Sequence, residues 1–226
     1  MHNRPIFDTE RFLHAEGYHL IAGIDEAGRG AWAGPVVASA VILPPDIDTK
    51  LLKEVNDSKK MSPAKREYCY GLIFDHALAV SSCWESHKTI DKSGILPATK
   101  LAMKKAVAGL ASKPNYLLID YLSLPDINIS QRGIKFGDAL CLSIACASII
   151  AKVTRDRMMV ELENEYTGYN LHRNKGYGTR EHALGLKKKG PCNIHRKSFR
   201  PVREVTAKTM LAKGYEVLAL FLCSAI

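Results

Sequence analysis

The stretch Gly23–Gly30, which reads Gly-Ile-Asp-Glu-Ala-Gly-Arg-Gly, constrains this chain more than any other. It follows the apolar run 20–22 and precedes a longer one over residues 34–43. Apolar runs on either side of a glycine-rich segment predict a strand, a turn and a second strand. Asp25 and Glu26 end the first strand, where a buried carboxylate is costly unless a cation neutralises it. Lys, Arg or a metal ion could do so, and the open, glycine-rich turn with its one arginine favours a site for a divalent metal and a phosphodiester.

The two adjacent acids pose a geometric problem. Consecutive side chains on a regular strand point to opposite faces of the sheet. Asp25 and Glu26 could therefore not both face one site on an undistorted strand. We expect a bulge, or the start of the glycine turn, at this pair.

The remaining pattern alternates strands with helices. Its apolar runs predict strands over 18–25, 34–43, 79–84, 115–120 and 134–136. Helical spacing and caps predict helices over 8–16, from Ser62-Pro63 onward, over 96–110 and 139–165, and from Thr179 to Gly190. Three hairpin-like strands followed by alternating strands and helices indicate an α/β sandwich built on a mixed sheet.

Two more acids share the setting of the first pair. Asp120 and Asp138 each end an apolar run, where an acidic side chain is poorly solvated. A single acid at a strand end is usually a turn former, and Asp138 could simply cap its helix. Four such acids in one α/β fold suit Mg²⁺ or Mn²⁺, which prefer hard oxygen ligands, better than Zn²⁺. Two such ions could activate a water and align it with a phosphorus atom.

Other chemistries have weaker support. A transesterase that uses the RNA 2′-OH would want two activated histidines, and the basic region offers His172, His182 and His195. Cys192 and His195 have a metal-like spacing, but no second half of a zinc site follows. A dinucleotide fingerprint fails because a strand, not a helix, is predicted after the glycine turn.

The net charge of +9 lies entirely in the C-terminal third. Residues 152–213 hold 15 Lys and Arg against 6 Asp and Glu, whereas the remainder of the chain is balanced. A polarised basic face suits a polyanion, although a merely solvated charged surface is the alternative. The six cysteines show no paired spacing, and no secretory signal is visible, so we expect free thiols and a cytoplasmic location.

Several sequence blocks, in order, resemble the type 2 ribonuclease H (ribonuclease HII) family. The first is Ile24–Gly30 with Gly34–Val37, and the second is Asn56–Lys60. Ala147–Asp156, Lys175–Thr179 and Gly190–Phe199 complete the set. The blocks cover about residues 22–202. Together they are specific, whereas each alone would be weak.

The resemblance implies a ribonuclease H-like fold: a mixed five-stranded sheet flanked by helices, with a helical C-terminal extension. It implies a catalytic domain over residues 1–165 and a basic extension over 166–226. The implied activity is metal-dependent endonucleolytic hydrolysis of the RNA strand of RNA–DNA hybrids. It includes nicking 5′ of single ribonucleotides in duplex DNA, leaving 3′-OH and 5′-phosphate ends. The alternative is a protein that binds hybrids without cleaving them.

The resemblance also assigns residues. The family's metal-site acids, for Mg²⁺ or Mn²⁺ in a two-metal site, fall on Asp25, Glu26, Asp120 and Asp138. Its ribose-sensing turn falls on Gly28, Arg29 and Gly30, and its substrate-contacting tyrosine on Tyr177. Ser58, Lys59 and Lys152 lie in its motif blocks and are expected at the substrate; lysines there can contact phosphates without sequence preference.

The sequence departs from the family at three places. Ala31-Trp32 stands where Pro-Leu is usual, Tyr121 follows Asp120 where Gly is common, and Leu140 replaces a common Lys near the metal site. The tail after Lys213 lies outside the resemblance. It is apolar but too short to span a membrane, so the tail could instead dock a protein partner. We also expect the protein to be a monomer.

Overall fold

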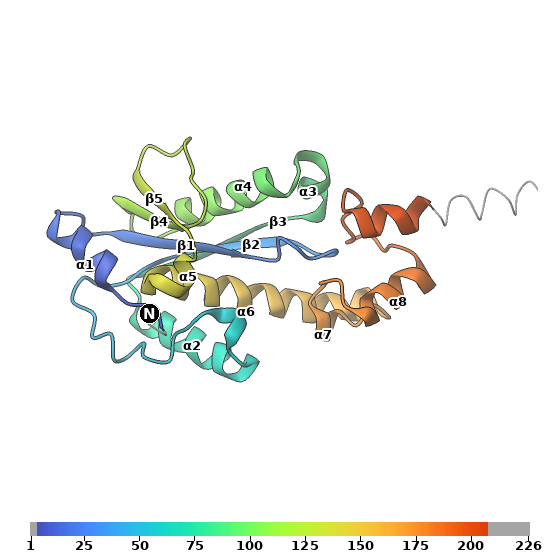
Figure 1. Cartoon of the computed structure of the whole chain (residues 1–226), viewed down its shortest axis with the longest axis horizontal. Coiled ribbons are helices and arrows are strands. Elements are labelled where there is room, and N and C mark those ends of the chain that lie inside the picture. The colour runs from blue at the N-terminus through green and yellow to red at the C-terminus, as the bar shows by residue number, and fades with distance from the viewer. Residues whose placement is uncertain (1–3, 208–226) are drawn as a thin grey trace, which may run out of the picture. The chain divides into compact units, whose positions relative to one another are not determined.

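The computed structural model describes residues 4–207 and contains one five-stranded sheet with helices around it (Figure 1). The strands are β1 (Ile21–Ala27), β2 (Val36–Ile42), β3 (Ala79–Glu85), β4 (Tyr116–Asp120) and β5 (Ser130–Ile134). The helices are α1 (Asp8–Ala15), α2 (Pro63–His76), α3 (His87–Ser93), α4 (Ile95–Ala108), α5 (Gly137–Leu140), α6 (Leu142–Glu165), α7 (Leu171–Asn174) and α8 (Arg180–Lys189), with a 3-10 turn, η1, over Ser58–Lys60. Residues 200–207 are also helical.

The sheet is mixed, as predicted. Its strand order is β3-β2-β1-β4-β5. The pairs β1–β2 and β2–β3 are antiparallel, whereas β1–β4 and β4–β5 are parallel. The last paired residues of β1 and β4 are Ile24 and Ile119. Because the two strands run in the same direction, Asp25 and Asp120, which follow those residues, lie at the same end of the sheet.

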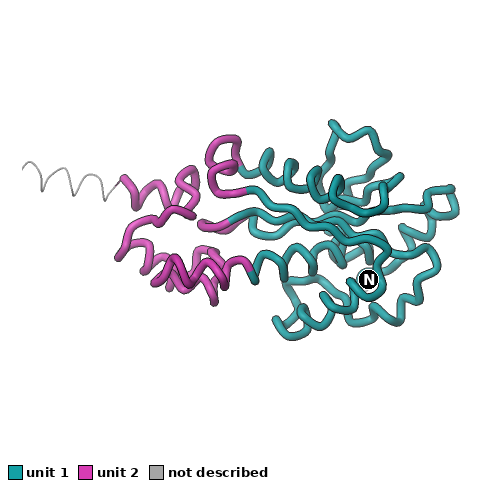
Figure 2. Tube along the Cα trace, turned by 180° about the vertical axis from the view of Figure 1, so that it is seen from behind, with its two compact units in different colours: residues 1–29, 35–85, 95–157 teal, residues 30–34, 86–94, 158–226 magenta. Residues whose placement is uncertain are grey.

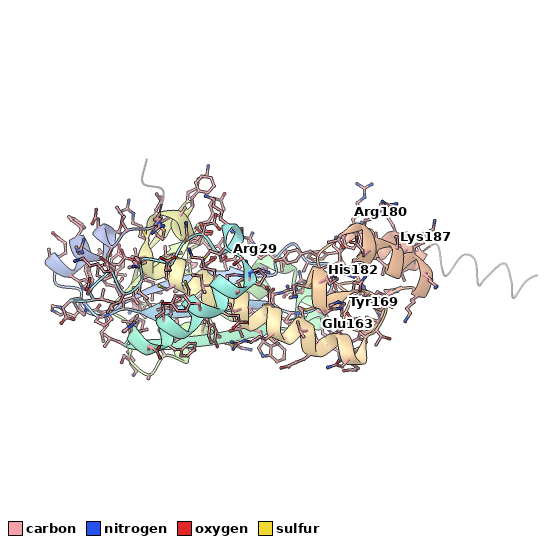
Figure 3. The ribbon with its side chains drawn as sticks, turned by 90° about the horizontal axis from the view of Figure 1, so that it is seen from below. Arg29, Glu163, Tyr169, Arg180, His182 and Lys187 are labelled. Atoms are coloured by element: carbon pink, nitrogen blue, oxygen red, sulfur yellow. The ribbon has the colours of Figure 1, made fainter. Side chains whose placement is uncertain are left out.

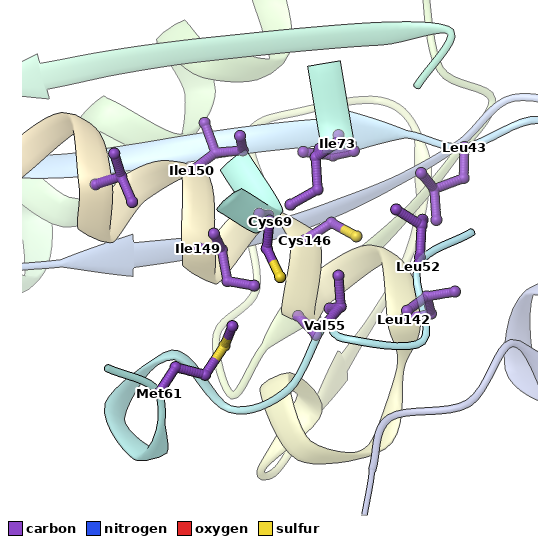
Figure 4. Close-up of a cluster of buried hydrophobic side chains, with 14 of the residues drawn as sticks. Leu43, Leu52, Val55, Met61, Cys69, Ile73, Leu142, Cys146, Ile149 and Ile150 are labelled. Atoms are coloured by element: carbon purple, nitrogen blue, oxygen red, sulfur yellow. The ribbon is translucent and has the colours of Figure 1, made fainter. Parts of the chain in front are cut away.

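Helices cover both faces of the sheet. Helix α4 packs on one face, where Ile24 of β1 meets Met103 and its neighbours in a buried cluster. Helices α2 and α6 cover the opposite face, and Figure 4 shows Cys69, Ile73 and Ile150 in the cluster between them. Helix α6 lies so close to β1 that a Cβ at Gly23 would be 2.2 Å from the Ser143 backbone. A glycine is needed there to let the helix approach the strand.

The described residues form two compact units (Figure 2). The first unit contains the sheet and comprises residues 4–29, 35–85 and 95–157. The second comprises residues 30–34, 86–94 and 158–207, so the segment after the glycine turn belongs with α7 and α8. Each unit is described by itself below.

Helix starts follow the predicted caps. The Ser62 hydroxyl accepts the Lys65 N–H at 3.3 Å with Pro63 in the first helical position. Likewise, Thr179 Oγ1 accepts the His182 N–H at 3.3 Å. Side-chain acceptors at these positions satisfy backbone donors that have no partner within the helix.

Two predicted elements are placed differently by the structure. The fifth strand is Ser130–Ile134, and not 134–136, because Asp120 pairs with Ile134 at the end of the ladder. The long helix expected over 139–165 is broken at Cys141 into α5 and α6. The N-terminal segment causes this break: Ile6 N–H donates to Leu140 O, and Leu142 N–H donates to Ile6 O. Such pairing across more than 130 residues leaves no local sequence signal.

The five cysteines within the described residues are all free thiols, as predicted: Cys69, Cys83, Cys141, Cys146 and Cys192. Among residues 4–207, no helix is both long enough and apolar enough to cross a membrane. The apolar tail, for which a docking role was predicted, lies outside the described residues.

Candidate active site

Asp25 is the most deeply buried of the four predicted acids. Its carboxylate is 3% exposed, accepts the Glu26 N–H at 2.7 Å and is hydrogen-bonded with Ser148 of α6. Burial raises the pKa of Asp25 well above 3.8, and the neighbouring Glu26 and Asp120 carboxylates raise it further. A divalent cation would offset this repulsion. Buried carboxylates that repel one another are typical of a site that binds a cation.

Glu26 occupies the same strand end without a bulge. The β1–β2 register continues one to one through Glu26–Ala38 and Ala27–Val37, so neither the predicted bulge nor the predicted start of the turn lies at this pair. The ladder with β4 has ended by this point, since its last pair is Ile24–Ile119. The Glu26 carboxylate still interacts with Asp120, so both acids contribute to one electrostatic site.

The Glu26 carboxylate is only half satisfied. Its Oε1 lies 3.2 Å from Arg29 Nη1, whereas its Oε2 is buried and has no hydrogen-bond partner among the described residues. Burial raises the pKa of Glu26 and outweighs the opposing effect of the Arg29 guanidinium. A buried carboxylate oxygen without a donor is costly, and a bound cation is one way to satisfy it.

Asp120 ends β4 and is tied to the next acid in the chain. Its Oδ1 accepts the Gly137 N–H at 2.7 Å, which fixes the start of α5 beside the strand end. A Cβ at Gly137 would lie 2.6 Å from Ile144 Cδ1, so a larger residue would require the Ile144 side chain to move. Burial raises the pKa of Asp120, and the nearby Asp138 contributes to the increase despite the Gly137 hydrogen bond.

Asp138 lies in the first turn of α5 and is 6% exposed. Its side chain does not cap the helix, because the N-cap position belongs to Phe136 and has no side-chain hydrogen bond. Instead, Asp138 Oδ2 pairs with Lys59 Nζ at 3.1 Å. Burial lowers the pKa of Lys59, but the Asp138 carboxylate and the nearby Asp25 more than compensate, so that the net shift is upward.

The structure therefore brings the four acids into one electrostatic cluster, with Lys59 and Arg29 as its cations. As the side chains stand, no group of three or more His, Cys, Asp or Glu in residues 4–207 is arranged to hold a metal ion. The donor chemistry nevertheless fits a hard divalent ion: the acids repel one another, and one buried Glu26 oxygen has no donor. A bound ion would compete with Arg29 for Glu26 and with Lys59 for Asp138.

The glycine turn rests on a buried arginine. Gly28 has φ +94°, and a Cβ there would lie 2.0 Å from Arg155 Nε. Arg155 is fully buried, and its Nε donates to Pro35 O at 2.8 Å. Gly28 is thus required for both its backbone conformation and its packing, whereas a Cβ at Gly30 would meet no described atom within 4 Å.

Ser58 and Lys59 lie on η1, whose first turn is capped by Asp57. Asp57 Oδ1 accepts the Lys59 N–H at 2.9 Å. The Ser58 hydroxyl is buried and lies 2.9 Å from Ser148 Oγ. Ser58 therefore supports Ser148, which in turn holds Asp25; direct contact of Ser58 with substrate stays a prediction.

Lys152 is largely covered. Its Nζ pairs with Asp156 Oδ1 at 2.6 Å one helical turn later, and its side chain is 19% exposed. Burial lowers the pKa of Lys152, and the neighbouring Arg66 and Arg155 add to this effect. Phosphate contact by Lys152 stays a prediction.

Tyr177 belongs to the second unit and is partly exposed. Its backbone is fixed by three hydrogen bonds: its N–H donates to Asn174 O at 2.9 Å, and its carbonyl accepts from Thr179 N and His182 Nδ1 at 2.8 and 2.9 Å. The side chain is flanked by Gly176 and Gly178.

The histidines proposed as alternative catalysts are placed differently. His182 and His195 are fully buried, and their Nε2 atoms lie 3.0 Å apart. His172 is exposed beside Glu163. Cys192 lies 3.0 Å from His195 through its sulfur and bonds it directly. Buried rings that bond each other are not available to activate a ribose hydroxyl.

Sequence reasoning missed two supporting residues, Ser148 and Arg155. Ser148 had a usable signal, since it is a polar residue in the apolar run 139–148 that packs against the sheet. Arg155 was counted in the basic face, as was Arg196, yet both are fully buried. Exposed cations of the second unit include Arg180 and Lys187 on α8 (Figure 3).

The sheet order, the flanking helices and the acid cluster at the ends of β1 and β4 define a ribonuclease H-like fold. Among solved structures, ribonuclease H2 from Pyrococcus horikoshii matches with a TM-score of 0.72 at 24% identity, over 84% of this chain and 98% of that one. Bst-RNase HIII in complex with Mn²⁺ matches with a TM-score of 0.63 at 18% identity, over 86% of this chain and 71% of that one.

The family is shown by sequence. The family model described as Ribonuclease HII matches residues 22–202. A Ribonuclease HII from Dehalococcoides mccartyi is 53% identical over 199 residues, which cover 88% of this chain and 94% of that protein. The chain belongs to the Ribonuclease HII family and is a ribonuclease H. The predicted family, fold and enzyme class are confirmed.

Proposed function

We propose that this ribonuclease H hydrolyses the RNA strand of RNA–DNA hybrids, and nicks 5′ of single ribonucleotides in duplex DNA, with divalent metal ions. The observation that carries the proposal is the acid cluster in the first unit: Asp25, Glu26 and Asp120 all have a raised pKa, and burial is the largest cause for each of them. Buried acids that lie close together, one of which has an oxygen without a hydrogen-bond donor, favour a metal site in an enzyme that cleaves phosphodiesters.

Asp25, Glu26, Asp120 and Asp138 would hold Mg²⁺ or Mn²⁺ in a two-metal site. Bound there, the ions would supply an activated water and charge stabilisation for the departing oxygen, which predicts 3′-OH and 5′-phosphate ends. A protein of the same fold, Bst-RNase HIII, is described in complex with Mn²⁺, which supports the choice of metal. Lys59 and Arg29 neutralise the acids in this structure.

The chain's other residues would bind and orient the substrate. Gly28, Arg29 and Gly30 present an open turn at which backbone donors can reach a ribose 2′-OH, the group that locally distinguishes RNA from DNA. Tyr177 would pack on the neighbouring sugar or base. Ser58, Lys59 and Lys152 would line the substrate path, where the lysines contact phosphates without reading sequence.

We further assign residues 1–165 to catalysis and 166–226 to a basic extension that holds the nucleic acid. Exposed cations on α8, Lys187, Lys188 and Lys189, support the second assignment. We expect a monomer that acts in the cytoplasm, in keeping with the free thiols of the described cysteines.

End-group analysis tests the proposed chemistry. The full-length protein is incubated with Mn²⁺ and a DNA duplex that contains one ribonucleotide, and both product ends are identified. The proposal expects a nick on the 5′ side of the ribonucleotide with 3′-OH and 5′-phosphate ends. A 2′,3′-cyclic phosphate would show attack by the ribose hydroxyl, which contradicts the metal–water mechanism.

A further inference from the structure

A fully buried histidine pair lies at the centre of the second unit. The rings of His182 and His195 have their centroids 5.2 Å apart, and their Nε2 atoms are within hydrogen-bond distance at 3.0 Å. Tyr169 stacks edge-on against His195 with a centroid distance of 4.8 Å, and Figure 3 shows it beside His182. The acid cluster lies in the first unit, whereas these residues belong to the second.

The partners of the pair set the direction of its hydrogen bonds. The Cys192 N–H donates to His195 Nδ1 at 3.0 Å, so the proton of His195 must be on Nε2. That proton is then donated to His182 Nε2, which leaves the His182 proton on Nδ1. Nδ1 donates in turn to the Tyr177 carbonyl at 2.9 Å. Two neutral rings thus connect the Cys192 backbone to the Tyr177 backbone.

The surroundings keep both rings neutral. The titratable groups that face the pair are Tyr169, Cys192 and His87, none of which is an acid that would stabilise an imidazolium. Burial lowers the pKa of His195 to about 4, with a further contribution from His182. Burial also lowers the pKa of His182. The chain of hydrogen bonds from Cys192 through the two rings to Tyr177 is therefore intact at neutral pH.

Trp32 lies in the segment 30–34, which follows the glycine turn. It links this segment to the loop that carries Tyr177. Its backbone N–H donates to Gly176 O at 2.8 Å, and its indole packs against the His182 ring with a centroid distance of 5.4 Å and a tilt of 42°. The indole also covers Gly178, where a Cβ would lie 2.1 Å from Trp32 Cζ2. Arg196 also holds this segment, because its backbone N–H donates to Trp32 O at 2.8 Å.

We propose that Trp32, His182 and His195 are positioning residues that hold the Tyr177 loop and the segment after the glycine turn as one rigid piece. This inference rests on the proposed contact of Tyr177 with substrate. A tyrosine between two glycines would otherwise sample many positions, and each would have to be lost on binding. The hydrogen bonds to the Tyr177 carbonyl and the packing of Trp32 on Gly178 restrict Tyr177 before the substrate binds. The loss of conformational entropy on binding is therefore smaller.

A double-mutant cycle tests the proposal. The variants Trp32→Leu, His182→Phe and Tyr177→Ala are prepared singly, and the first two are also combined with Tyr177→Ala. KM and kcat are measured with Mn²⁺ on a duplex that contains one ribonucleotide. Trp84→Leu, at the other tryptophan, which is 52% exposed on β3, is the matched control. Circular dichroism establishes the folded fraction of each variant, and Trp32→Phe replaces Trp32→Leu if that variant does not fold.

We expect Trp32→Leu and His182→Phe each to raise KM about tenfold with little change in kcat, the effect of losing one well-placed contact. In the Tyr177→Ala background the same changes should add less than about twofold, because the three residues act through Tyr177. Amide hydrogen exchange over residues 174–179 should be faster in both single variants. Trp84→Leu should change none of these readouts.

Full additivity with Tyr177→Ala, or an unchanged KM in Trp32→Leu and His182→Phe, would overturn the positioning role. If Tyr177→Ala alone leaves KM unchanged, the proposed substrate contact of Tyr177 is wrong, and this inference falls with it. The single Tyr177 variant thus distinguishes the two failures.

Discussion

Lys59 Nζ lies 3.1 Å from Asp138 Oδ2, so one of the four clustered acids already has a cation. Arg29 and Glu26 form a second such pair at 3.2 Å. The cations in these pairs offset the negative charge of the buried carboxylates, as a metal ion would. An arriving ion must therefore compete with a side chain, and the competition can be measured.

We expect Lys59→Ala to bind Mn²⁺ more tightly than the wild type, by about two- to fivefold, because a competing cation is removed. The effect is small because the Lys59 side chain is largely exposed and its charge is screened. Isothermal titration calorimetry measures the affinity. Lys60→Ala is the control, since Lys60 pairs with Asp57 outside the cluster. Weaker binding in Lys59→Ala would mean that the ion does not occupy the space near Asp138.

Asp120→Asn should reduce cleavage by about a thousandfold or more while leaving hybrid binding within about threefold of the wild type. The amide oxygen can still accept the Gly137 N–H, so α5 should stay in place. Cleavage is measured under single-turnover conditions, and binding by fluorescence anisotropy without metal. Asp126→Asn, at an exposed acid paired with Lys104, serves as the control. Concurrent loss of binding would show that Asp120 is structural.

Gly28→Ala should destabilise the fold by about 2–4 kcal/mol, from a strained positive φ and a clash with buried Arg155. Gly30→Ala should cost less than about 1 kcal/mol, since its Cβ would enter open space. Urea denaturation of both variants gives the two values. Equal costs would show that the turn is not held against Arg155.

The histidine pair predicts a pH dependence of stability. The pKa of His195 is lowered from 6.5 to about 4 in the folded protein. The unfolded chain therefore binds more protons between these values, and folding stability should fall as the pH decreases from 6.5 toward 4. The loss attributable to His195 is on the order of 3 kcal/mol.

Urea denaturation at pH 7 and pH 4.5 measures this loss. The difference between the two pH values should be smaller in His195→Asn than in the wild type. His172→Asn, at an exposed histidine, should behave as the wild type does. An unchanged difference in His195→Asn would mean that its ring is not held neutral by the fold.

The sequence predicted those parts of the fold that depend on local chemistry. Caps at Ser62 and Thr179 and acids at the ends of apolar runs can be identified from neighbouring residues, and the structure places them accordingly. The break between α5 and α6 could not be predicted, because Ile6, far away in the chain, supplies the hydrogen bonds that cause it. The bulge prediction was wrong: the β1–β2 register stays one to one through Glu26, and the Glu26 carboxylate nevertheless interacts with Asp120.

The same distinction between local sequence and tertiary structure applies to the residues of the site. Asp25, Glu26, Asp120 and Asp138 could be selected as candidates because four acids in one α/β fold each end an apolar run. The His182–His195 pair could not be identified in this way, since both were taken for surface or catalytic candidates. Only the tertiary fold brings two rings from different segments within 3.0 Å in a buried position. Arg155 was misread as a surface charge for the same reason.

The central claim is that the four acids form a divalent-metal site for phosphodiester hydrolysis. Its most direct test is a Mn²⁺ titration that follows nicking of a duplex with one ribonucleotide, for the wild type and Asp25→Asn. We predict no nicking without metal, saturable activation in the wild type, and no activation in Asp25→Asn at the same concentrations. Nicking by the wild type in the presence of a chelator, or equal activation of Asp25→Asn, would contradict the claim.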